Sequence, residues 1–198
     1  MIKSLNIHPN QELIRACQRN DRKAQMMLYK NYYKAMYHTA NRILENPVEA
    51  EDVMQEAFID AFQKISQLSD EQSFGAWLKR IVINKALDVI KREKTIQSYR
   101  EMIQHEILED EEVDDQEPDL QYQLREVQLA MQNIPDQYRI VLSLHLFEGM
   151  DYEEMGQILN LEYNNVKTKY SRARQRLIGE IQRLQNQQGK KEVWHVEN

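Results

Sequence analysis

The sequence predicts an all-α protein in which two small helical domains are joined by a flexible acidic linker. Only five Gly and four Pro occur in 198 residues, while Leu, Gln, Glu, Lys and Arg are abundant, a composition that favours helices. Apolar residues recur at intervals of three or four on both sides of a dense acidic segment. We expect domains at 1–94 and 121–186, with the linker at 95–120 and a polar tail at 187–198.

The first domain should hold a series of amphipathic helices. Asn10 to Arg19 and Asp21 to Leu44 have helical apolar periodicity. Asn46-Pro47 should start the next helix, which continues to about Gln67, because Asn is a good cap and Pro suits the first helical position. A further helix begins near Ser73, with Phe74, Trp77, Leu78, Ile81 and Ala86 turned inward to pack. It leaves a polar outer face: Lys79, Arg80, Asn84, Lys85, Lys91 and Arg92.

The acidic segment from Thr95 to Leu120 is predicted to be a flexible linker. It carries ten acids against one base, Arg100, and it also contains Pro118. Such a segment has too few apolar residues to pack and repels itself into an extended form. A cluster of metal-binding carboxylates is the alternative, but dense acids more often form a hydrated linker. We therefore expect no metal site and no cofactor.

The second domain begins with two helices. Gln121 to Asn133 forms the first, and Ile134-Pro135 interrupts it. Asp136 should cap the next helix, which continues through Phe147 and ends at Gly149.

A helix-turn-helix follows between Asp151 and Arg176. Asp151 and Glu154 have the spacing of a capping box, and Asn160 tolerates the left-handed conformation that ends a short helix. The second helix should begin near Glu162. Its apolar residues lie on one stripe: Val166, Tyr170, Ala173, Leu177, Ile181 and Leu184.

The opposite face of this second helix is basic, because up to Arg176 it carries five bases and no acid. This pattern is typical of a helix that enters the major groove of DNA, whereas the plainer alternative is a solvated amphipathic helix. The net charge of −6 does not exclude DNA, since the acids concentrate in the linker. We predict DNA contacts from Asn164, Asn165, Lys167, Thr168, Lys169, Ser171, Arg172, Arg174 and Arg176.

Composition also argues against other classes of protein. The sequence has neither a membrane-spanning run nor the apolar segment of a signal peptide, so we expect a cytoplasmic location without membrane insertion. Cys17, the only cysteine, excludes an internal disulfide and should be a small core residue. No nucleophile-base pair, Gly-rich phosphate loop or HExxH motif is present, so we do not expect an enzyme.

Four segments in this order resemble bacterial RNA polymerase sigma factors: Ala50–Phe62, Ser73–Arg92, Ala130–Met150 and Asp151–Arg176. The resemblance covers nearly the whole chain, from about Leu13 to Leu184. Because no further domain lies between the two halves, the chain resembles the extracytoplasmic-function (ECF) type of sigma factor, which retains only regions two and four. It implies a subunit that binds core polymerase and opens promoter DNA without hydrolysing nucleotide.

The resemblance implies three sets of site residues. In region two, an acidic helix would dock on the clamp helices of core polymerase around an apolar anchor. The alternative there is a set of ordinary surface carboxylates over a core stripe. The residues of this surface are Glu51, Asp52, Met54, Gln55, Glu56, Phe58 and Asp60.

The two remaining sets would bind promoter DNA. In region two, a polar pocket, a base-reading Asn and phosphate-binding cations would hold the melted minus-ten element. These residues are Ser69, Lys79, Arg80, Asn84, Lys85, Lys91 and Arg92. In region four, the base edges of the minus-thirty-five element would face Lys167, Thr168, Ser171 and Arg172, and phosphates would face Lys169, Arg174 and Arg176.

One four-residue stretch and one single position depart from the family pattern. Residues Glu162 to Asn165 replace a small turn that usually contains Gly-Thr, and Gly156 replaces a usual alanine. An anti-sigma factor is a possible further partner, by the same resemblance. The alternative function is a free-standing helix-turn-helix regulator, although such repressors usually dimerise and this sequence shows no dedicated dimer interface.

Overall fold

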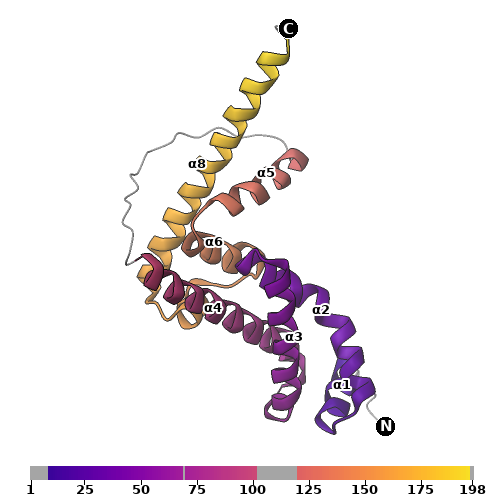
Figure 1. Ribbon diagram of the computed structural model, residues 1–198. Coiled ribbons are helices and arrows are strands. Elements are labelled where there is room, and N and C mark those ends of the chain that lie inside the picture. Colours follow the sequence, from indigo (N-terminus) through magenta and orange to yellow (C-terminus); the bar gives the residue numbers. More distant parts are fainter. Residues whose placement is uncertain (1–8, 69, 102–119, 197–198) are drawn as a thin grey trace, which may run out of the picture. The chain divides into compact units, whose positions relative to one another are not determined.

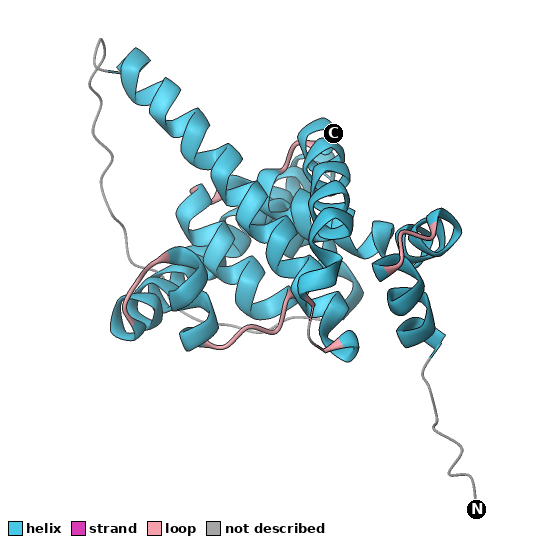
Figure 2. Ribbon diagram, turned by 90° about the horizontal axis from the view of Figure 1, so that it is seen from below, coloured by secondary structure: helices cyan, strands magenta, loops and turns pink. Residues whose placement is uncertain are grey.

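A computed structural model describes residues 9–68, 70–101 and 120–196, and all regular structure in these residues is helical (Figures 1 and 2). The chain divides into two compact units, Met1–Ile103 (unit 1) and Gln104–Asn198 (unit 2). Unit 1 contains α1 (Pro9–Gln18), α2 (Arg22–Leu44), α3 (Pro47–Lys64), short 3-10 turns at Ile65–Gln67 and Glu71–Ser73, and α4 (Phe74–Glu101). Unit 2 contains α5 (Leu120–Asn133), α6 (Asp136–Leu142), a π-helical turn at Ser143–Phe147, α7 (Tyr152–Leu159) and α8 (Tyr163–Val196).

The starts of two helices in unit 1 are fixed by local side chains. The Asp21 carboxylate accepts hydrogen bonds from the backbone of Lys23 at 2.8 Å and of Ala24 at 3.3 Å. Asn46 caps α3 in the same way, and Pro47 occupies its first position. Each cap satisfies backbone donors that a helix end otherwise leaves unpaired. The expected helix starts are therefore confirmed.

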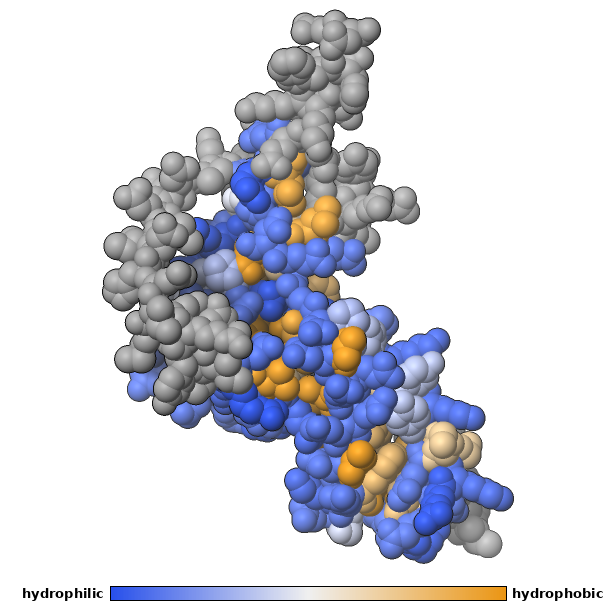
Figure 3. All heavy atoms as spheres, in the orientation of Figure 1, coloured by the Kyte–Doolittle hydropathy of each residue, from blue (hydrophilic) through white to orange (hydrophobic). Residues whose placement is uncertain are grey.

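The core of unit 1 forms where α2, α3 and α4 pack against one another, with α1 against α2. Leu28, Phe58 and Leu78, one from each of the three helices, are at most 2% exposed. Phe74 is 1% exposed and meets the ring of Tyr32 edge-on at 5.4 Å, so it packs in the core as expected. Hydrophilic residues consequently cover most of the coloured surface in Figure 3.

In unit 2, α5, α6 and α7 each pack against α8. The expected apolar stripe of α8 is confirmed: Val166 and Ala173 are 0% exposed and Leu177 is 8% exposed. The helix that begins with α6 widens into the π-helical turn and ends at Gly149, whose φ of 71° favours glycine.

Two helices extend into segments outside the expected domains, and one expected cap is wrong. Helix α4 continues to Glu101, into the range assigned to the linker, because no Gly or Pro interrupts it there. Helix α8 continues through the expected polar tail to Val196, because that segment is rich in helix-forming Gln, Lys and Glu. Asp136 is the first residue of α6 and not its cap; Pro135 holds the cap position, and the Asp136 carboxylate lies 3.0 Å from Arg139 Nη2. The remainder of the expected linker, 102–119, lies outside the described residues.

Candidate nucleic-acid interface

The turn between α7 and α8 is built by short-range hydrogen bonds. Asp151 Oδ1 accepts from the backbone of Glu153 at 2.9 Å and of Glu154 at 2.8 Å, while Glu154 Oε2 accepts from the Asp151 backbone at 3.0 Å. The capping box is therefore complete. Asn160 ends α7 with φ 53° and ψ 49°, in the left-handed region. Both sequence expectations are confirmed.

The glycine at position 156 has a structural reason. The Leu161 backbone donates a hydrogen bond to the Gly156 carbonyl at 3.0 Å, which draws the turn close against α7. A Cβ atom at position 156 would lie 2.8 Å from the Leu161 carbonyl oxygen. This is closer than Cβ and backbone oxygen atoms normally approach, so the tight turn depends on Gly156.

The predicted DNA-contacting residues of α8 fall into three groups around the helix. Thr168 and Ser171 point away from the buried stripe and are exposed. Lys167 and Arg174, seven residues apart, share one flank, whereas Lys169 lies on the other flank and is half-buried. The remaining predicted residues are all exposed: Asn164, Asn165, Arg172 and Arg176.

The Thr168 side chain is oriented by its own helix. Its hydroxyl donates to the Asn164 carbonyl at 2.9 Å, so the oxygen lone pairs are what it offers to a ligand. At the start of α8, the Glu162 carbonyl accepts from Asn165 and Val166 and begins the helix. The atypical turn residues therefore produce a regular helix start.

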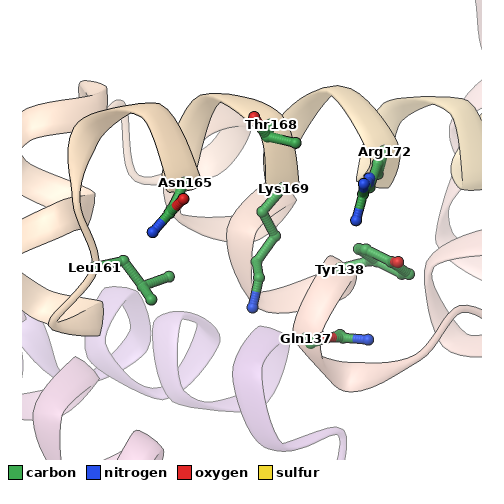
Figure 4. Close-up of a pocket in the computed structure, with 7 residues that line it drawn as sticks. All are labelled: Gln137, Tyr138, Leu161, Asn165, Thr168, Lys169 and Arg172. Carbon is green, nitrogen blue, oxygen red and sulfur yellow. The ribbon is translucent and has the colours of Figure 1, made fainter.

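One flank of α8 forms a groove with the start of α6. Figure 4 shows Lys169 and Arg172 extending from α8 on the side of Gln137 and Tyr138 of α6, while Asn165 lies nearer Leu161. The groove has a volume of about 290 Å³, and Leu161 closes one end of it. Gln137 and Tyr138 cannot be recognised from the sequence, because only packing of α6 against α8 brings them beside the basic flank.

The start of α7 lies against the opposite flank through aromatic contacts. Tyr152 lies 5.8 Å from the Tyr163 ring and 5.6 Å from the Tyr170 ring. His145 packs at 4.6 Å from Tyr170, and its Nδ1 lies 2.8 Å from the Met150 carbonyl oxygen. These ring contacts hold α8 in a fixed orientation relative to α7.

In unit 1, the outer face of α4 presents part of the expected minus-ten surface. Arg80, Asn84 and Lys91 are exposed and spaced by four and seven, which places them on one stripe. Asp88 interrupts this stripe, with its carboxylate 3.5 Å from Lys91 Nζ, and is an acidic residue that was not among those expected there. Arg92 is also exposed, Lys79 is half-buried, and Ser69 lies outside the described residues.

Lys85 does not lie free on the outer face, so that expectation is wrong. Its Nζ lies 3.1 Å from Asp60 Oδ2 and 3.3 Å from Glu56 Oε2, both on α3. Its side chain is 24% exposed. Burial disfavours the charged form, but hydrogen bonds from the ammonium to Asp60 and Glu56 outweigh it and raise the pKa of Lys85. Lys85 therefore joins α4 to α3.

The acidic surface expected to bind polymerase is only partly as predicted. Glu51, Asp52, Gln55 and Glu56 are exposed along α3, and Asp60 is half-buried. Met54 and Phe58 are 3% and 2% exposed, so they cannot form an exposed apolar anchor; both belong to the core. The exposed apolar residues on α3 are Val48 and Ile59. Helical periodicity cannot separate a core stripe from an anchor, because both have the same spacing.

Comparison with known proteins identifies both units. Residues 28–96 match the family model of Sigma-70 region 2, and residues 124–177 match that of Sigma-70 region 4. Together the two matches cover more than half of the chain. The chain belongs to the ECF sigma factors of RNA polymerase.

Full-length relatives agree with this identification. This chain is 28% identical to the ECF RNA polymerase sigma factor SigW of Bacillus subtilis, over 86% of this chain and 96% of the relative. It is 29% identical to the RNA polymerase sigma-H factor of Pseudomonas aeruginosa, over 88% and 95%. The fold resembles that of the sigma factor RpoE of Bartonella quintana, solved in complex with the anti-sigma factor NepR (TM-score 0.55, 20% identity, 79% and 96% covered).

The sigma factor family is not a class of enzymes. Within the described residues, no group of three or more His, Cys, Asp or Glu is placed to hold a metal ion. None of the helices that the structure describes is long and apolar enough to span a bilayer.

Proposed function

We propose that this sigma factor divides promoter recognition between its two units. Unit 1 binds core RNA polymerase through α3 and holds the melted minus-ten strand on α4. Unit 2 reads the duplex minus-thirty-five element with α8. This division assigns the polymerase and minus-ten roles to a domain at about 1–94 and the minus-thirty-five role to one at about 121–186.

The observation that carries the proposal is the outer face of α8. From Tyr163 to Gly179 the helix has five bases and no acid, and the bases lie on its exposed face and flanks. A helix of this kind suits the major groove, with polar side chains toward base edges and cations toward the phosphates on either side. The capping box and the close turn at Gly156 hold this helix against α7.

Unit 1 supports the other half of the proposal. Arg80, Asn84 and Lys91 offer cations and an amide along one exposed stripe of α4, as a melted strand requires. The exposed carboxylates of α3 offer electrostatic steering toward a basic partner surface, with Val48 and Ile59 as accessible apolar contacts. The Lys85 bridge keeps α3 and α4 together.

The partners are therefore core RNA polymerase, through its clamp helices, and promoter DNA. An anti-sigma factor is a further partner in this proposal, as NepR is for RpoE. The sigma factor acts wherever its polymerase acts, which places it in the cytoplasm.

The test is run-off transcription with purified core polymerase and two variants. Arg172→Ala should weaken binding to minus-thirty-five duplex by about 1–3 kcal/mol and relax its sequence preference. Asn84→Ala should leave that duplex binding intact and reduce promoter opening, measured by permanganate reactivity of unpaired thymines. Arg183→Ala and Asn31→Ala are matched controls, because both positions are exposed and lie outside the proposed surfaces.

Two results would contradict the proposal. Equal losses for both variants in both assays would show that the two contacts are not divided between the units. DNA binding without any initiation by core polymerase would instead favour a free-standing helix-turn-helix regulator. The presence of both sigma regions in one chain argues against that alternative.

A further inference from the structure

The groove between α6 and α8 has the composition of an anion site. Its possible donors are two amides, one hydroxyl, an ammonium and a guanidinium: Gln137, Asn165, Tyr138, Lys169 and Arg172. Thr168 also lines the groove, but its hydroxyl donates to the Asn164 carbonyl. None of the lining residues is acidic. The groove opens beside the outer face of α8, so an anion that occupied it would lie next to a bound duplex.

Two of these groups are held in place by the fold. The Tyr138 ring packs against the unit 2 core cluster, which includes Leu142 and Ala173, and this contact limits how far its hydroxyl can move. Lys169 is half-buried, so its aliphatic stem rests on the protein while its ammonium reaches the groove. A site with its donors already positioned loses less conformational entropy when it binds.

The two flanks of α8 differ in charge. The start of α7, which packs against the other flank, carries the carboxylates of Asp151, Glu153 and Glu154. Negative charge at that position repels a phosphate and already occupies the helix N-terminus. The first turn of α6 carries a single carboxylate, Asp136, which lies 3.0 Å from Arg139 Nη2. The α7 side therefore has more carboxylates than the α6 side.

We propose that Gln137 and Tyr138, together with Lys169, form a seat for one backbone phosphate of the strand that borders the minus-thirty-five element. This inference rests on the proposed function and extends it. Phosphate contacts carry no base information but fix the register and angle of a recognition helix. Gln137 and Tyr138 are thus positioning residues that come from outside the helix-turn-helix.

The test uses the full chain with core polymerase and measures affinity for a promoter duplex. Gln137→Glu places a carboxylate in the seat and should weaken binding about tenfold through repulsion of the phosphate. Gln132→Glu is the matched control, because it makes the same charge change at an exposed position of α5 outside the groove. Tyr138→Phe keeps the ring in the core and removes only the hydroxyl, so it should weaken binding without loss of stability.

A scan with single methylphosphonates locates the phosphate. Neutralising one position of the duplex should weaken binding of the wild-type chain, and at that position Gln137→Glu should cause no additional loss. Equal affinities of the Gln137→Glu and Gln132→Glu variants, or losses that add at every position, would overturn the seat. If Arg172→Ala then still weakens binding, the proposed function stands and only the seat is wrong; if Arg172→Ala also has no effect, the minus-thirty-five assignment itself fails.

Discussion

The bridge from Lys85 to α3 allows a quantitative test of what holds unit 1 together. Lys85→Met removes an ammonium that contacts Asp60 at 3.1 Å and Glu56 at 3.3 Å and keeps a side chain of similar length. An exposed ion pair contributes about 0.2–1 kcal/mol, and a hydrogen bond to a charged group about 1.5–3 kcal/mol. Since Asp60 and Glu56 remain 34% and 64% exposed, water can solvate them after the change. We therefore expect the free energy of unfolding of unit 1 to fall by about 1–2 kcal/mol.

The assay is urea unfolding followed by tryptophan fluorescence. The chain contains two tryptophans, so a Trp194→Phe background leaves Trp77 to report on unit 1. Lys64→Met is the matched control: Lys64 Nζ lies 3.9 Å from the same Asp60 carboxylate, but its side chain is 55% exposed. This control should change the unfolding free energy by less than about 0.5 kcal/mol.

The difference in unfolding free energy between the wild-type chain and Lys85→Met should depend on pH in a defined direction. The pKa of Lys85 is raised in the folded state. Its stabilisation is therefore complete below the ordinary lysine pKa of about 10.4 and disappears as the pH rises through the raised value. Equal effects of Lys85→Met and Lys64→Met would refute the bridge. Full stability combined with weaker DNA binding would show that Lys85 faces DNA and not α3.

Three further predictions concern stability and reactivity. Asp151→Ala should lower the free energy of unfolding of unit 2 by about 1–2 kcal/mol, measured by thermal unfolding. Asp151→Asn keeps a side-chain acceptor and should lower it less. Equal losses for the two variants would exclude the capping box as the cause. A hydrogen bond from Arg15 lowers the pKa of Glu71 in the folded state. This pair therefore stabilises unit 1 above the unfolded glutamate pKa of about 4.3, and the stabilisation is lost as the pH falls through the lowered pKa. Arg15→Gln should make the melting temperature depend less on pH between 3 and 5, and an unchanged dependence would contradict the pair. Burial raises the pKa of Cys17 to about 11, so about a thousandth of the thiol is ionised at pH 8. Labelling of this thiol with a thiol-reactive reagent should therefore be slow until urea unfolds the chain, and fast labelling of the folded protein would contradict the burial.

The helical class and most helix starts follow from neighbouring residues in the sequence. Asp21, Asn46 and Asp151 each bond to backbone groups two or three residues ahead, so their effect is readable from neighbouring letters. The apolar stripe of α8 and its basic outer face follow from helical spacing in the same way. These features depend only on interactions within one turn or one helix.

Tertiary structure decided which side chains of each face are available. Met54 and Phe58 have the spacing of an anchor, but packing against neighbouring helices buries them. Lys85 belongs to the same basic series as Arg80, yet carboxylates from a separate helix engage it. Gln137 and Tyr138 meet Lys169 only because α6 packs on α8. In each case the deciding partner lies on another helix, and helical periodicity records only which face a residue shares within its own helix, not what that face meets.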